Sequence, residues 1–166
     1  MKTRVFLHTV FLRAVLLMLS ASLFAAEVSG ESNESDSHRS PSSDGASVGF
    51  ANLHNGDVLP PEFTVIFTIS GMGIAPAGVA IDNTGHHHLL IDVTELPDLN
   101  QPLPATDNIR HFGKGQSQTS LNLPEGEHSL QLLLADQVHR PHDPPVMSEV
   151  IVITVAADAP PQAEEE

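Results

Sequence analysis

The feature that most constrains the fold is the alternation of apolar and polar residues between Glu62 and Ser70. Successive side chains of a β-strand point to opposite faces, so every second residue shares a face. One face of this segment carries only large apolar residues: Phe63, Val65, Phe67 and Ile69. Thr64 and Thr68 lie on the other face. The segment is therefore predicted to be a strand with one face in a core.

Other short segments have strand-like composition, and turn residues separate them. They are residues 48–53, 86–93, 117–123, 128–136 and 148–155. The sequences Asn55-Gly-Asp57 and Pro124-Glu-Gly126 are typical of the turns between strands. No segment combines an apolar spacing of 3.6 residues with helix caps. The pattern predicts an all-β fold, an immunoglobulin-like antiparallel β-sandwich in a single domain.

Composition divides the chain into four parts. Residues 1–30 combine basic residues, an apolar run and small residues, as in a secretory signal peptide cleaved near residue 26 or 30. An uncleaved membrane anchor is the alternative, although Arg13 interrupts the apolar run. Residues 31–46 are predicted to be a disordered Ser-rich linker, 47–156 the β-sandwich domain, and 157–166 a disordered acidic tail. The protein is therefore expected to be periplasmic or secreted, and its lack of cysteine leaves stability to the core alone.

Charge and composition exclude several classes of partner. The formal net charge is −14, and removal of residues 1–30, with three basic residues and one acidic residue, would make it −16. Such acidity disfavours nucleic acid and anionic membranes and favours cations. The chain has no Trp or Tyr, so it lacks the aromatic platforms of sugar-binding and single-strand-binding modules. No Gly-x-Ser-x-Gly sequence and no cysteine nucleophile is present.

Histidine is concentrated in one part of the chain. Seven of the ten histidines fall between His86 and His142, and three of them are consecutive. On a strand, His86 and His88 share a face at a Cα separation of about 7 Å, close enough to bind one ion. Imidazole is a common ligand of transition metals. The alternative is that these histidines are hydrogen-bonded residues beside the core.

A second pair, His139 and His142, lies in a Pro-rich segment whose extended backbone would suit a preorganised site. His111, in a Gly-flanked loop, is a further candidate ligand, whereas His128 at the start of a strand is expected to be structural. Met72 and Met147 lie near the two histidine motifs, and thioether with imidazole favours copper over zinc. The predicted metal ligands are His86, His88, His139 and His142, followed by His111 and Met72.

Several short sequence motifs occur together and in order. They are Ser70-Gly-Met-Gly73, Pro76-Ala-Gly78, Thr84-Gly-His-His-His-Leu-Leu-Ile-Asp92, His111-Phe-Gly-Lys-Gly-Gln116, Leu130-Gln-Leu-Leu-Leu134 and His139-Arg-Pro-His-Asp-Pro-Pro-Val-Met-Ser148. This set resembles the bacterial exported family catalogued as domain of unknown function 4399, over roughly residues 48–155. The resemblance implies a small exported β-domain with these histidine motifs, and it carries no established activity.

The leading hypothesis is an exported protein that binds or buffers a transition metal, copper before zinc, without catalysing a reaction. The alternative is a metal-free envelope module that contacts another protein through its polar loops. A metal-dependent enzyme is the third, and it would need an open coordination position and a general base.

Overall fold

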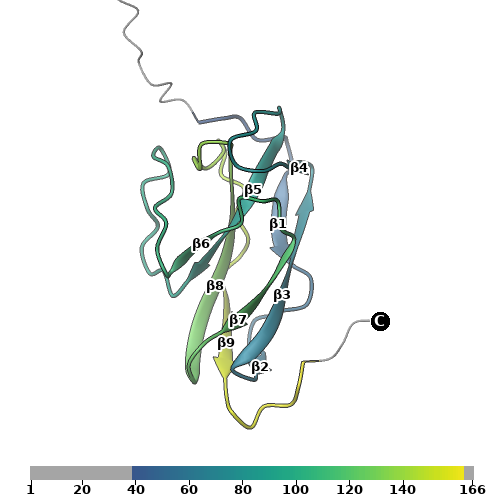
Figure 1. Ribbon diagram of the computed structural model, residues 1–166, viewed down its shortest axis with the longest axis vertical. Coiled ribbons are helices and arrows are strands. Elements are labelled where there is room, and N and C mark those ends of the chain that lie inside the picture. Colours follow the sequence, from purple (N-terminus) through teal and green to yellow (C-terminus); the bar gives the residue numbers. More distant parts are fainter. Residues whose placement is uncertain (1–38, 163–166) are drawn as a thin grey trace, which may run out of the picture. The chain divides into compact units, whose positions relative to one another are not determined.

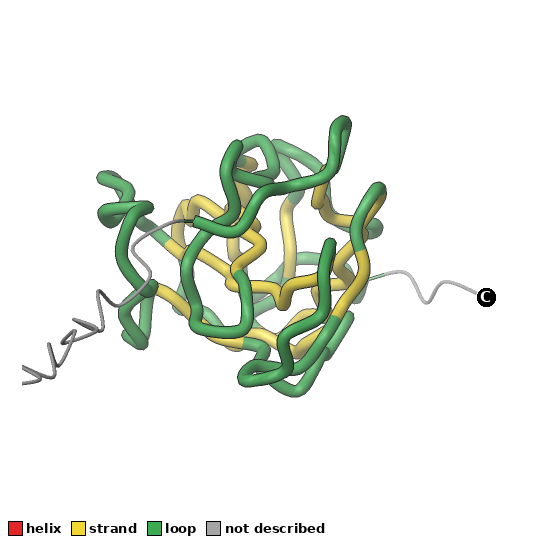
Figure 2. The backbone as a smooth tube through the Cα atoms, turned by 90° about the horizontal axis from the view of Figure 1, so that it is seen from above, coloured by secondary structure: helices red, strands yellow, loops and turns green. Residues whose placement is uncertain are grey.

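The computed structural model describes residues 39–162, and these residues form strands and loops without a helix (Figure 2). The predicted signal peptide therefore lies outside the described residues, as do residues 31–38 of the linker and 163–166 of the tail. No helix in the described part is long and apolar enough to cross a membrane.

Nine strands follow one another along the chain. They are β1 (Ser47–Phe50), β2 (Val58–Leu59), β3 (Glu62–Ser70), β4 (Gly73–Ile74), β5 (Thr84–Ile91), β6 (Ile109–His111), β7 (Gln118–Asn122), β8 (Gly126–Ala135) and β9 (Ile151–Val155). The strand predicted from alternation at 62–70 is β3, with its bounds unchanged. The other predicted strands are present with shifted ends, and the two- and three-residue strands β2, β4 and β6 were not anticipated.

The strands form two sheets (Figure 1). One has the order β1-β3-β7, and all of its pairs are antiparallel. The other has the order β2-β9-β8-β5-β4, and β6 also pairs with β5. Two of its outer pairs, β2 with β9 and β4 with β5, are parallel. A shared core joins the sheets, which confirms the predicted all-β sandwich.

The main core lies between the two sheets. Its fully buried residues come from both of them: Val65 and Leu121 from one, and Leu89, Leu130, Leu132, Leu134 and Ile153 from the other. Burying such a side chain stabilises the fold by about 1.5–3 kcal/mol. In β5 this face is formed by the odd-numbered residues, so His87 also points inward, with its ring centroid 5.0 Å from that of Phe67.

The opposite face of β5 is buried as well, because a second apolar cluster covers it. This cluster contains Leu90, Leu103, Ile109, Leu133 and Ala135, with Met147 packed against it. Leu103 comes from the long connection between β5 and β6, and Met147 from the segment after β8. The even-numbered histidines of β5 therefore lie beneath a layer of loops and do not face bulk solvent.

The described part of the predicted linker, residues 39–46, is held against the domain. Pro41 forms a parallel bridge with Asp143, and the backbone N–H of Asp143 donates to Ser40. Gln162, in the predicted tail, exchanges two hydrogen bonds with the backbone of Thr64. These segments have few apolar residues, but their backbone and side-chain polar groups find partners on the domain.

Candidate metal centre

Four histidines from three strand or turn segments meet on the loop-covered face of β5. His86 and His88 belong to β5 itself. His111 ends β6, which pairs with β5 so that His111 lies directly opposite His88. His139 lies in the turn after β8, in the left-handed region at φ 66°. The β5–β6 pairing and this turn bring together residues that are up to 53 positions apart in the sequence.

One ring nitrogen from each of the four histidines lies within 4.8 Å of the others. The six distances between ring centroids range from 4.5 Å for His111–His139 to 5.9 Å for His88–His139. In a tetrahedral zinc site, with Zn–N bonds near 2.05 Å, neighbouring nitrogens are about 3.3 Å apart. Small side-chain rotations would therefore close the cluster around one ion.

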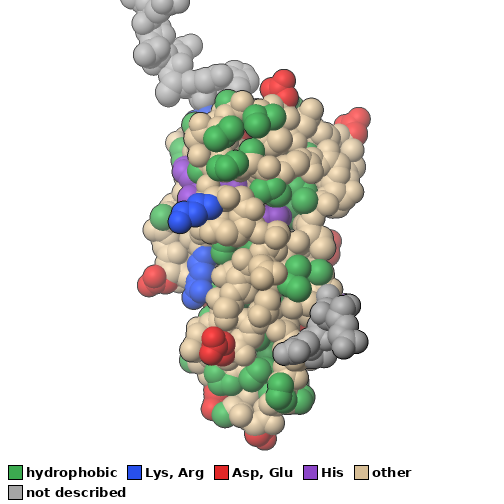
Figure 3. All heavy atoms as spheres, turned by 45° about the vertical axis from the view of Figure 1, so that its right-hand side comes forward, with side chains coloured by type: hydrophobic (Ala, Val, Ile, Leu, Met, Phe, Trp, Pro, Cys, Tyr) green, Lys and Arg blue, Asp and Glu red, His purple; other side chains and the backbone are tan. Residues whose placement is uncertain are grey.

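The cluster is buried on one side and open on the other. His86 and His88 are 0% and 2% exposed, whereas His139 is half-buried and His111 is exposed. A small cavity of about 80 Å³ reaches His88, His111 and His139, and its remaining wall is formed by residues 103–105. On the face drawn in Figure 3, histidine side chains reach the surface only as small separate patches. An ion could therefore enter from the His111 side.

Burial and mutual repulsion keep the two buried rings of the cluster, those of His86 and His88, neutral; we call them the inner rings. Burial, followed by the positive charge that His111 and His139 would carry, lowers the pKa of His86 to about 4. Burial, followed by His86, His111 and His139, lowers the pKa of His88 to about 3. The pKa of His111 is also lowered, by partial burial and by His139. A neutral imidazole can ligate a metal without first losing a proton.

Only some of the ring nitrogens of His86 and His88 have hydrogen-bond partners in the protein. His86 Nε2 lies 3.0 Å from His139 Nδ1, so one of these nitrogens donates a hydrogen bond to the other. The buried Nδ1 atoms of His86 and His88 have no hydrogen-bond partner among the described residues. An unsatisfied buried polar group costs about 1–3 kcal/mol. The four convergent imidazole donors fit a bound transition metal.

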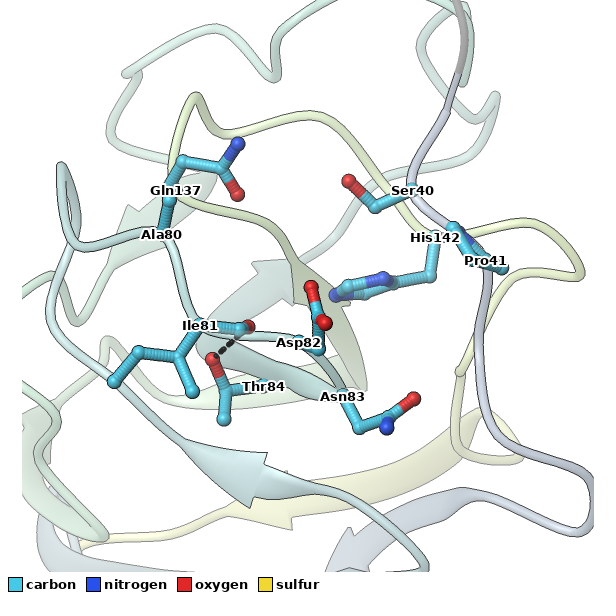
Figure 4. Close-up of a pocket in the computed structure, with 9 residues that line it drawn as sticks. All are labelled: Ser40, Pro41, Ala80, Ile81, Asp82, Asn83, Thr84, Gln137 and His142. Carbon is cyan, nitrogen blue, oxygen red and sulfur yellow. Dashed lines mark hydrogen bonds between the residues drawn. The ribbon is translucent and has the colours of Figure 1, made fainter.

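Of the six predicted ligands, the structure brings together His86, His88, His111 and His139. His142 lies elsewhere: it is 2% exposed and lines a separate pocket of about 430 Å³ with Ser40 and Pro41 (Figure 4). Its Nε2 would be 2.9 Å from a Cβ placed on Gly85. Gly85, an odd-numbered residue of β5, lies on the face opposite to that of His86 and His88.

Met72 also lies away from the four rings, because it packs against the core between the sheets. Met147 packs against the outer apolar cluster, and its bridge partner Leu133 separates it from His88 in the sheet. The cluster therefore offers nitrogen donors, and the sequence argument for a thioether ligand is not supported by the positions of these methionines.

His128 has a structural role, as expected. Its Nδ1 is 2.8 Å from the Asp92 carboxylate, and its Nε2 is 2.9 Å from the Pro124 carbonyl oxygen. Burial opposes the charged form, but these hydrogen bonds and the charge of Asp92 together raise the pKa of His128. The ring thus ties the end of β5 to the turn before β8.

Comparison with known proteins adds a family and no activity. The family model described as "Domain of unknown function (DUF4399)" matches residues 65–156, which include all four histidines of the cluster. The match confirms the family resemblance that the short sequence motifs indicated. No curated protein and no solved structure matches the chain.

Proposed function

The chain belongs to the family of domain of unknown function 4399, and we propose from its site that it binds one transition-metal ion through four histidines. The observation that carries the proposal is the convergence of His86, His88, His111 and His139, with ligand atoms within 4.8 Å of one another. Two of these rings are buried and held neutral in a strongly acidic chain. Four donors fill a tetrahedral site, which fits metal binding or buffering better than catalysis at an open position.

The ring arrangement favours zinc over copper(II). In a square-planar site, the centroid distances of the two opposite ring pairs would be clearly longer than the other four distances. The four rings can be divided into two pairs in three ways. The centroid distances are then 4.8 and 4.5 Å, 4.9 and 5.9 Å, or 5.0 and 5.2 Å, so no two opposite pairs are both clearly longer. A near-tetrahedral set of imidazoles suits Zn(II), whereas Cu(II) prefers tetragonal geometry. The preference for copper rested on methionine, and we propose zinc first and copper second.

Metal titration of the purified protein tests the proposal. After treatment with a chelator, the protein should take up one Zn(II) per chain, measured by competition with a chromogenic chelator. His88→Ala and His139→Ala should each lower the affinity more than tenfold, which corresponds to about 1.4 kcal/mol. Zinc at 100 times its Kd should also stabilise the folded state by about 2.7 kcal/mol and raise Tm.

Two matched substitutions serve as controls. His54→Ala removes an exposed histidine that lies outside the cluster, and Met72→Leu removes the predicted thioether; neither should change zinc or copper affinity. If the unsubstituted protein binds no stoichiometric metal, or if His88→Ala and His139→Ala bind it as tightly, the metal-binding function is wrong. The metal-free interaction module would then be the better reading.

We also propose that the protein acts outside the cytoplasm. The support is sequence pattern: the basic start, the apolar run and the small residues within residues 1–30, together with the absence of cysteine. N-terminal sequencing of the protein from the periplasm or the medium should find a chain that begins near residue 27 or 31. A full-length chain recovered from the cytoplasm would contradict this localisation.

A further inference from the structure

We propose that Asp136 is a positioning residue of the metal centre, which acts by holding the turn that presents His139. We also propose that residues 39–42, the segment before β1, help to hold this turn. This inference rests on the proposed metal-binding function. It concerns residues that the sequence motifs did not mark as part of the site. Residues 39–42 also lie outside the segment matched by the family model.

The first observation is the density of hydrogen bonds at Asp136, which is 2% exposed. Its Oδ1 accepts from the backbone N–H groups of Val138 at 2.9 Å and Arg140 at 3.0 Å. Its backbone carbonyl accepts from the N–H of His139, and its own N–H donates to the carbonyl of Arg140, both at 2.9 Å. One residue thus ties every position of the turn that carries the ligand, apart from Gln137.

The second observation is the backbone of His139. Its φ of 66° lies in the left-handed region, which costs a non-glycine residue about 1 kcal/mol or more. Such a conformation persists only where surrounding contacts hold it. The hydrogen bonds from Asp136 are those contacts, and the left-handed backbone directs the His139 ring toward His86, 3.0 Å away.

The third observation is that the other carboxylate oxygen faces the segment before β1. Asp136 Oδ2 accepts from Ser40 Oγ at 2.9 Å. Arg39 Nε donates to the carbonyl of Pro141 at 3.0 Å, and its guanidinium lies 3.4 Å from the Asp143 carboxylate. Figure 4 shows Ser40 and Pro41 running beside this part of the chain. The segment therefore holds the turn through contacts that lie outside the four-histidine cluster.

The negative charge of Asp136 would also increase the affinity of the site for a cation. The negative charge of the Asp136 carboxylate lies at the turn that presents His139. The same charge would attract a cation bound among the four rings. Residues that orient metal ligands from outside the coordination sphere affect affinity by about 10–100-fold when they are replaced.

Two substitutions separate positioning from charge. Asp136→Asn keeps an oxygen that can accept both backbone N–H groups but removes the charge, whereas Asp136→Ala removes both. We expect Asp136→Ala to lower Zn(II) affinity by at least about tenfold, with smaller losses for Asp136→Asn and for Ser40→Ala. Asp92→Ala is the matched control, since Asp92 also holds a backbone N–H, that of Ser129, and a histidine ring. It should lower stability and leave zinc affinity unchanged.

Two readouts distinguish positioning of His139 from a general loss of stability. In the His139→Ala background, Asp136→Ala should lower zinc affinity no more than Asp136→Asn does, because only the charge of Asp136 can still act once His139 is gone. Bound Co(II), used in place of Zn(II), should give the same altered visible spectrum in Asp136→Ala as in His139→Ala. A merely destabilised protein would keep the spectrum of the unsubstituted site.

The outcomes are separable. If the unsubstituted protein binds Zn(II) and Asp136→Ala binds it equally, or if the effects of Asp136→Ala and His139→Ala are additive, the positioning role is overturned and the proposed function stands. If the unsubstituted protein binds no metal, both are overturned. If Asp136→Ala does not fold, Asp136→Asn and Ser40→Ala are compared instead. If both bind zinc as tightly as the unsubstituted protein, the positioning role of Asp136 and of residues 39–42 is overturned.

Discussion

The metal-free protein should lose stability on mild acidification, and the inner histidines of the cluster should cause much of the loss. In the folded state the pKa values of His86 and His88 are lowered to about 4 and about 3. In the unfolded chain both return to about 6.5. Below pH 6.5 the unfolded state therefore binds more protons than the folded state, so stability falls as pH falls.

The magnitude follows from the same values. At pH 5 an ordinary histidine in the unfolded chain is almost fully protonated, whereas His86 and His88 in the folded protein remain mostly neutral. Each should therefore lower the free energy of unfolding by about 2 kcal/mol between pH 7.5 and pH 5. His88→Leu removes one of these contributions. With a urea m-value of about 1–1.5 kcal/mol/M, the pH-induced shift of its unfolding midpoint should be smaller by about 1.3–2 M.

Urea unfolding in the presence of a chelator, followed by far-UV circular dichroism, is the suitable assay, since the chain has no Trp or Tyr for fluorescence. The measured quantity is the change in unfolding free energy between the two pH values for each protein. The control is His54→Leu, because the His54 side chain is 80% exposed and lies outside the cluster, so the contributions of His86 and His88 remain in this variant. An equal pH dependence in the unsubstituted protein and in His88→Leu, within about 0.5 kcal/mol, would refute the assignment of the lowered pKa.

Three further outcomes are expected. Zinc affinity should fall less than about tenfold between pH 7.5 and 6.5, because the two inner rings carry no proton to displace; competition titration at each pH checks this. Gly113→Ala should lower zinc affinity, since its Cβ would lie 2.2 Å from the His111 ring and displace it, as chelator competition would show. His128→Asn should cost about 1 kcal/mol of stability at pH 6 and less at pH 9, because the raised pKa of His128 stabilises the fold only while the ring is charged; a loss independent of pH in urea unfolding would contradict this.

The fold could be predicted where the sequence repeats a period. The alternation in β3 fixed both its existence and its face, since a strand buried on one side needs every second residue to be apolar. β5 was found but carries no alternation, because both of its faces are buried. The strands β2, β4 and β6 have two or three residues each, too few to show a period. Their pairing depends on neighbours that are distant in sequence.

The site could be predicted only in part. Alternation placed His86 and His88 on one face, and the structure keeps that pair within the cluster. The three-residue spacing of His139 and His142 carried no such information, because irregular backbone sets no fixed relation between side-chain directions. The left-handed backbone of His139 and the turn held by Asp136 send the two rings to different places. An Asp three residues before a candidate ligand was the available signal for that turn.

The composition of the outer face of β5 argues against a purely structural role for its histidines. Leu90, Leu133 and Ala135 on the same face are buried and apolar, so this layer can be packed without polar groups. His86 and His88 instead leave two buried nitrogens unsatisfied, at about 1–3 kcal/mol each, and make the metal-free domain sensitive to acid. An ion coordinated by all four rings would stabilise the folded state alone, since only the paired strands and the turn of His139 bring the ligands together.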